Sequence, residues 1–237
     1  MLLLAACAQK PVVQPDTEPT LADLAGGQLP ASASEQARID RAQAIRAYRD
    51  YLARYPASAE RYEILRRLAD LLVASAADTL AVLPAGNGQS AANASTALAQ
   101  YREAIAIYDR LLQEAPGGQD RGEIYYQLSR ACEETGQLER AVAILDELIV
   151  RYPPVEVRLY ADALFRRGEL QFDLGRYAAA EVSYRGVVEL GETAPLYEQS
   201  LYKLGWSLFR QARYVEALDA YVVLLDRKLP AGTTVED

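Results

Sequence analysis

Few residues in this chain could do chemistry, and their types exclude the commonest catalytic sites. The 237 residues include no histidine and two cysteines, Cys7 and Cys132. Within this sequence, Ser-His-Asp and Cys-His catalysis and histidine-ligated metal sites are therefore excluded. Carboxylates remain, but Glu63 and the neighbouring Glu133 and Glu134 lie in helical patterns, where charged side chains ordinarily face solvent. We predict that the protein is not an enzyme and has no cofactor and no metal site.

The two cysteines have different surroundings. Cys132 occupies a core-facing position in a helical pattern, where small buried thiols are common, and we interpret it as a packing residue. Cys7 follows a Leu-Ala-Ala tripeptide, which resembles the lipobox of bacterial lipoproteins. In that family the cysteine is lipidated and becomes the mature N-terminus, and a non-acidic residue after it implies delivery to the outer membrane. The resemblance therefore implies lipidation of Cys7.

The segment around Cys7 is short for a secretory signal. Six residues precede the cysteine, none of them basic, whereas an apolar h-region alone needs roughly 7 to 15 residues. We therefore expect the start to be truncated or misassigned; the alternative is an accidental Leu-Ala-Ala-Cys. Residues 8–34 are rich in Ala, Pro, Gln, Gly and Thr and lack a helical period, as is typical of a flexible tether. We predict a signal remnant and tether over residues 1–34.

The remaining chain carries a small residue that recurs with the same apolar neighbours. Each alanine of the set stands four residues before one bulky apolar residue and seven before another. The alanines are Ala44, Ala104, Ala141, Ala180 and Ala217. This spacing puts each set on one face of an amphipathic helix, with the small residue where a neighbouring helix approaches closely. Self-similarity of this kind indicates a stack of helix pairs.

The last three alanines are each preceded by a turn and by a further helical pattern in the same phase. The sets are Leu128-Ser129 with Gly136 and Leu138, Arg167-Gly168 with Gly175 and Tyr177, and Leu204-Gly205 with Ala212 and Tyr214. This pattern resembles the tetratricopeptide repeat, whose first helix carries Leu-Gly, whose turn carries Gly-x-Tyr and whose second helix carries the alanine. Arg167 and Ala212 depart from the pattern, at the Leu and at the turn Gly. The resemblance spans residues 35 to 230 and implies an all-α solenoid.

The organisation along the chain follows from these units. We predict a solenoid over residues 35–237, with three units near 122–153, 161–192 and 198–229. The turn-forming and polar residues between 82 and 97 indicate an inserted loop in the first full repeat. No polar capping helix follows the last unit, so we expect a longer array or a partner that covers its end.

Charge and hydropathy restrict the class of partner. The net charge is −8, with 33 acidic and 25 basic residues. An acidic chain opposes the phosphate neutralisation that dominates nucleic-acid affinity, so we predict no nucleic-acid binding. No apolar run reaches the roughly 18 residues needed to span a bilayer, so contact with a membrane would be made through the lipid anchor.

The resemblance also implies where a ligand binds. In tetratricopeptide arrays the first helix of each unit lines a concave groove. Carried over to this sequence, the candidate groove residues are Tyr126, Arg130, Phe165, Glu169, Phe172, Tyr202, Trp206 and Phe209. Aromatic side chains bury a large area at low entropic cost, so Tyr202, Trp206 and Phe209 are the best candidates. The alternative is that several of the aromatics pack between adjacent repeats.

These observations predict a non-catalytic scaffold of the bacterial cell envelope, lipid-anchored to the periplasmic face of the outer membrane. Its partners would be peptide or helix segments of envelope proteins. The segments at residues 55–58 and 202–206 are similar to envelope repeat proteins, including the lipoprotein of the β-barrel assembly machinery and the Tol-Pal coordinator. The alternatives are a cytoplasmic adaptor, and the repeat region of a longer protein with a further domain after Asp237.

Overall fold

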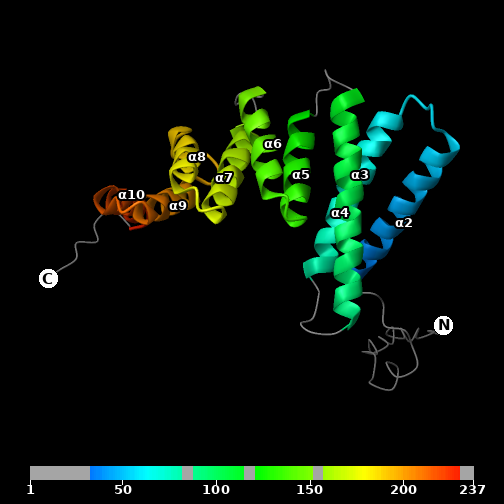
Figure 1. Cartoon of the computed structure of the whole chain (residues 1–237), viewed down its shortest axis with the longest axis horizontal. Coiled ribbons are helices and arrows are strands. Elements are labelled where there is room, and N and C mark those ends of the chain that lie inside the picture. The colour runs from blue at the N-terminus through cyan, green and yellow to red at the C-terminus, as the bar shows by residue number, and fades with distance from the viewer. Residues whose placement is uncertain (1–32, 82–87, 115–120, 152–156, 230–237) are drawn as a thin grey trace, which may run out of the picture. The chain divides into compact units, whose positions relative to one another are not determined.

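The computed structural model describes residues 33–81, 88–114, 121–151 and 157–229. Cys7 and the tether as far as residue 32 lie outside these ranges. The described residues form helices throughout: α2 Ala33–Arg54, α3 Arg61–Ala81, α4 Gly88–Glu114, α5 Arg121–Glu134, α6 Leu138–Arg151, α7 Val157–Asp173, α8 Tyr177–Glu189, α9 Tyr197–Arg210 and α10 Tyr214–Lys228 (Figure 1). The chain divides into two units, residues 1–39 and 40–237. The predicted all-α solenoid is confirmed.

The helices of residues 121–229 form three antiparallel pairs, α5–α6, α7–α8 and α9–α10. Each pair also packs on the one before it, through α6 with α7 and α8 with α9. The turns inside the pairs contain Gly136, Gly175 and Ala212, all with positive φ, at 75°, 74° and 61°. The backbone N–H after each of them donates to the carbonyl five residues earlier, as in a Schellman motif, for example Arg213 N to Leu208 O at 3.0 Å. Ala212 therefore adopts the left-handed turn conformation even though it carries a Cβ atom.

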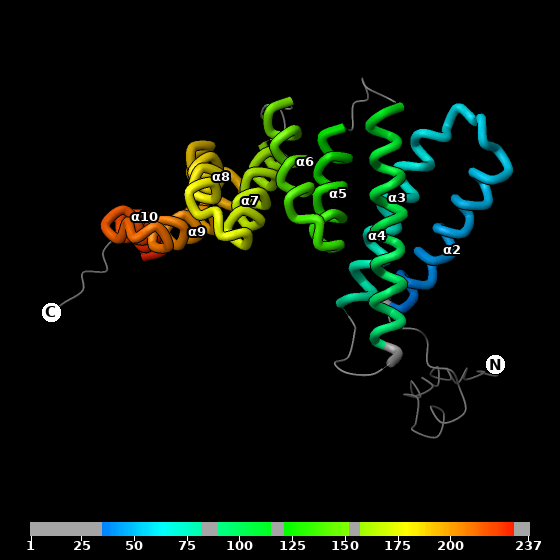
Figure 2. Tube along the Cα trace, in the orientation of Figure 1, coloured from blue at the N-terminus to red at the C-terminus, as the bar shows by residue number. Residues whose placement is uncertain are grey.

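In the first pair, α3–α4, the structure differs from the prediction of a loop near residues 82–97. Helix α4 begins at Gly88, so residues 88–97 are helical rather than irregular. Residues 82–87 lie outside the described part of the chain. The polar Ser-, Asn- and Gln-rich stretch forms the first turns of a 27-residue helix that lies against the 21-residue α3 (Figure 2). Tertiary packing overrides its weak helix propensity, because Ala97 and Tyr101 on the same face are buried.

The first of the five recurrent alanines is not equivalent to the others. Ala104, Ala141, Ala180 and Ala217 are buried, whereas Ala44 is only half-buried. In α2 the residue in the core is Ile45, one position later, and Tyr48 and Leu52 pack beside it. The apolar face of α2 is therefore rotated by one residue from the predicted face.

Close approach inside the later pairs depends on glycine. A Cβ atom on Gly168 of α7 would lie 2.6 Å from Cε1 of Tyr184 in α8, and one on Gly205 of α9 would lie 2.5 Å from Cε1 of Tyr221 in α10. The ring of the second helix thus fills the space that a side chain on the first helix would take.

Cys132 of α5 is fully buried in the core, and burial raises the pKa of its thiol to about 11. Its interpretation as a packing residue is confirmed.

Candidate functional site

Three of the predicted groove residues form one exposed surface on α9. Tyr202, Trp206 and Phe209 follow at intervals of four and three along this helix, and they are between 39% and 47% exposed. Their rings meet edge to face, with centroids 6.4 Å apart for Tyr202 and Trp206 and 5.7 Å apart for Trp206 and Phe209. We refer to these three residues as the α9 aromatic surface. Three large aromatic rings held together on a rigid helix can bury much area against a partner at little entropic cost.

The other predicted aromatic residues lie between repeats. Phe165 and Phe172 of α7 are half-buried against the core cluster that joins α8, α9 and α10. Phe165 meets the ring of Tyr184 at 5.7 Å. Tyr126 of α5 is half-buried against the preceding core, with the Arg166 guanidinium 5.9 Å from its ring centroid. For these three residues the structure matches the alternative of packing between adjacent repeats.

The two predicted polar groove residues are occupied by contacts within the protein. Glu169 accepts a hydrogen bond from Lys203 Nζ at 2.7 Å and another from the Tyr184 hydroxyl. Arg130 is half-buried, and its Nη1 donates to Gln127 Oε1 at 3.4 Å. Glu169 therefore ties α7 to α8 and α9, and its carboxylate is already engaged by these two donors.

A cavity of about 350 Å³ lies beside the α9 aromatic surface. Its lining comes from three helices and consists of Phe165, Glu198, Gln199, Tyr202, Lys203, Leu224 and Lys228. Lys228 forms an ion pair with Glu198 at one side of it. The α10 residues Leu224 and Lys228 were missed by sequence reasoning, because the repeat pattern assigns ligand contacts to first helices only. The cavity forms a recess beside the exposed ring of Tyr202, and an apolar side chain could enter it.

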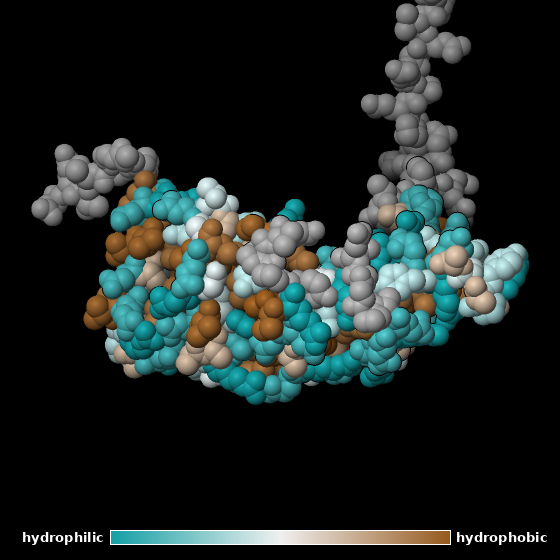
Figure 3. Space-filling model, turned by 90° about the horizontal axis from the view of Figure 1, so that it is seen from above, coloured by the Kyte–Doolittle hydropathy of each residue, from teal (hydrophilic) through white to brown (hydrophobic). Residues whose placement is uncertain are grey.

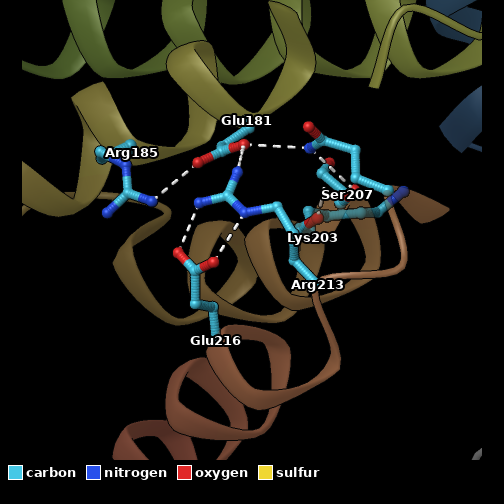
Figure 4. Close-up of polar contacts among 7 residues, drawn as sticks. Glu181, Arg185, Lys203, Ser207, Arg213 and Glu216 are labelled. Carbon is cyan, nitrogen blue, oxygen red and sulfur yellow. Dashed lines mark hydrogen bonds and ion pairs between the residues drawn. The ribbon is translucent and has the colours of Figure 1, made fainter. Parts of the chain in front are cut away.

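A buried carboxylate joins the last two helix pairs. Glu181 of α8 accepts hydrogen bonds from Arg185 at 2.8 Å, from Gln211 at 2.9 Å and from Arg213 Nη1 at 2.5 Å (Figure 4). Arg213 also pairs with Glu216. Burial raises the pKa of Glu181, but the bonds from Arg185 and Gln211 and the charge of Arg213 together outweigh it and lower this pKa. The sequence held one signal of this contact, since Arg176 and Arg213 stand at the same place in successive repeats.

The Glu181 contact makes a pH-dependent contribution to stability. Because the pKa of Glu181 in the folded protein lies below its ordinary value of 4.5, its stabilisation is present above pH 4.5 and is lost as the pH falls through the folded pKa. We expect Glu181→Gln to lower the free energy of unfolding by roughly 1–3 kcal/mol at pH 7. Denaturant titrations should show the gap to the wild type closing below pH 4.5. Glu189→Gln, an exposed carboxylate on the same helix, is the control and should change little; a gap that stays constant with pH would contradict this account.

Within the described ranges, no group of three or more His, Cys, Asp or Glu side chains is placed to hold a metal ion. None of the helices from α2 to α10 combines the length and the apolar character that crossing a bilayer requires.

Comparison with solved structures supports the repeat architecture. A crystal structure of the MamA protein matches with a TM-score of 0.55 and 18% identity, over 81% of this chain and 85% of that one. A tetratricopeptide repeat protein from Parabacteroides merdae matches with a TM-score of 0.58 and 17% identity, over 81% of this chain and 62% of that one. At these identities the likeness concerns the fold. No relative was found among curated protein sequences.

Comparison with family models identifies the repeat itself. Two models, both described as tetratricopeptide repeat, match residues 96–161 and 165–231. Together they span more than half of the 237 residues. Their ranges contain the helix pairs whose alanines and glycines fit the repeat pattern, and repeats of this type generally bind protein partners. The chain belongs to the tetratricopeptide repeat family.

Proposed function

We propose that the protein is a non-catalytic scaffold of the bacterial cell envelope that binds a protein partner through the α9 aromatic surface. One observation carries the binding role: three large aromatic side chains are exposed together on one rigid helix. The equivalent residues of α7, Phe165, Glu169 and Phe172, are half-buried in contacts between repeats. Tyrosine and tryptophan are enriched among residues that dominate binding energy. The cavity beside Tyr202 supplies a recess for an apolar anchor of the partner.

The envelope location rests on the sequence near Cys7. The lipobox-like tripeptide, the non-acidic residue after the cysteine and the tether-like composition of residues 8–34 together support a lipid-anchored domain held away from the outer membrane. A coil of this length spans roughly 30 Å. From the segments at residues 55–58 and 202–206 we also propose a mode of action at the periplasmic face like that of the lipoprotein of the β-barrel assembly machinery or the Tol-Pal coordinator; these segments do not name the pathway.

Mass spectrometry of Cys7 tests the location. The protein would be recovered from membrane fractions of a Gram-negative host, and we expect a diacylglycerol-modified Cys7 in the outer-membrane fraction. An unmodified chain in the cytoplasm would overturn the anchor and favour the cytoplasmic adaptor.

Site-specific crosslinking tests the binding surface. A photoreactive phenylalanine analogue placed at Trp206 should crosslink to envelope proteins in living cells, because this ring stands at the centre of the α9 aromatic surface. The matched control places the same analogue at Val182, an exposed apolar residue of α8. Equal crosslinking from both positions, or none from position 206, would refute a specific role for the aromatic surface.

A further inference from the structure

The last helix carries a second exposed apolar feature, separate from the α9 aromatic surface. Four side chains of α10 and that of Leu229, which follows the helix directly, stand at intervals of three and four residues, and each is between 49% and 74% exposed. They are Val215, Leu218, Val222, Leu225 and Leu229. We refer to them as the α10 stripe. Hydrophobic surface gathers over the α9–α10 end, at the left of the space-filling view (Figure 3). Such spacing is the pattern by which one helix packs along another.

The preceding repeat shows what lies on the corresponding face. Equivalent residues in these two repeats are 37 apart, as for Ala180 and Ala217, so Leu218 and Val222 correspond to Glu181 and Arg185 of α8. There Glu181 is buried under the next helix pair while Arg185 stays exposed, and Gln211 and Arg213 from the turn of that pair donate to the Glu181 carboxylate (Figure 4). Beside the apolar packing of α8 on α9, the contact at Glu181 therefore works through charged hydrogen bonds.

The α10 stripe cannot repeat the contact that Glu181 makes on α8. Leucine at position 218 offers no acceptor to a turn that carries arginine and glutamine, and burial of such donors without partners is costly. Valine at position 222 likewise replaces the arginine that completes the Glu181 contact. The exchange of a charged pair for two exposed apolar residues favours an occupant that presents an apolar helix face.

Charge at the border of the stripe specifies the occupant further. Asp219 and Asp226 are exposed, stand seven residues apart and follow Leu218 and Leu225 directly, so both border the stripe on the same side. Within residues 33–81, 88–114, 121–151 and 157–229, neither carboxylate has an ion-pair partner. In an antiparallel pairing of two α10 helices these acidic borders would face each other, and an anionic membrane would repel them. A helix with basic residues beside its apolar face complements both features.

We propose that the α10 stripe docks an amphipathic helix of a partner protein, with apolar residues at three- and four-residue spacing and lysine or arginine along the border that faces Asp219 and Asp226. This inference rests on the proposed scaffold function and names the chemistry of one partner segment. The docking surface shares no residue with the α9 aromatic surface, so the two can be tested separately.

The test measures binding of synthetic helices to the full chain by fluorescence anisotropy. The probe is a labelled amphipathic peptide of about four turns, or roughly 15 residues, with leucines at stripe spacing and lysines beside them. A second peptide replaces the lysines with glutamates, and a third scrambles the leucines. We expect the lysine peptide to bind and the other two to bind at least tenfold more weakly. The protein variant Leu218→Glu/Val222→Arg, which introduces the residues found on α8, should also lose at least tenfold, whereas Val182→Glu should not.

Several results would overturn this proposal. They are equal binding of the three peptides, unchanged binding by Leu218→Glu/Val222→Arg, dimerisation of the wild type that this variant abolishes, and binding of the wild type to anionic phospholipid vesicles through the stripe. Circular dichroism of the variant must show wild-type helicity, which we expect because both positions are exposed. If crosslinking from position 206 survives in the variant while the peptide test fails, the scaffold function stands and only the helix-docking inference is lost.

Discussion

Replacing Tyr184 with alanine is expected to lower the free energy of unfolding by about 3–5 kcal/mol. Its ring is fully buried and fills the space beside Gly168, and its hydroxyl donates to Glu169. The smaller side chain would leave a cavity between α7 and α8 that the glycine cannot fill. Denaturant unfolding followed by far-ultraviolet circular dichroism measures the loss.

Two further variants separate the causes of this effect. Tyr184→Phe keeps the ring and removes the hydroxyl, so we expect a loss of about 1 kcal/mol. Tyr221→Ala removes the equivalent ring from the last pair, where it is only half-buried, and should cost clearly less than Tyr184→Ala. If the two alanine variants are equally unstable, the ring in α8 does not owe its importance to enclosure by a following pair.

Replacing Ala180 with leucine should also destabilise the protein, by about 1–3 kcal/mol. Ala180 is fully buried where α8 crosses its neighbours, and a larger side chain would force these helices apart. Ala217→Leu tests the same position in the last pair and is expected to act in the same direction. Thermal and denaturant unfolding measure both variants.

Ala44→Leu is the informative control for this series. The sequence places Ala44 in the same pattern as the other alanines, but in the structure it is half-buried and Ile45 takes the core position. We therefore expect a change within about 0.5 kcal/mol. A loss as large as that of Ala180→Leu would show that α2 docks in the register of the later repeats.

The repeat units could be predicted from the sequence because small residues recur where helices cross. Ala104, Ala141, Ala180 and Ala217 locate four second helices correctly, since close approach leaves no alternative to a small side chain. Ala44 misleads because its spacing imitates the pattern, whereas in the structure Ile45 takes the core position of α2. The prediction of a loop near residues 82–97 was wrong from Gly88 onward. Composition indicates only the local preference of this segment, whereas its packing on α3 determines that it is helical.

The binding surface was only partly predictable, and the reason is positional. Phe165 and Tyr202 occupy equivalent places in their repeats, but Phe165 is half-buried against the next pair and Tyr202 is exposed. A motif assigns both to the groove, since it carries no information on which unit is last among the described helices. The predicted lipidation of Cys7 and the envelope location remain predictions.

Cross-repeat ion pairs have a consequence for how the protein unfolds. Arg140 pairs with Asp109, Arg176 with Glu139 and Arg213 with Glu181, so each helix pair from α5–α6 onward holds the one before it through an arginine. In linear repeat arrays, coupling between neighbours determines whether units melt together or one by one. Most of these pairs are partly exposed and therefore screened by salt. We therefore expect rising ionic strength to weaken this part of the coupling between units, whereas the apolar clusters that continue from one pair to the next still hold the units together.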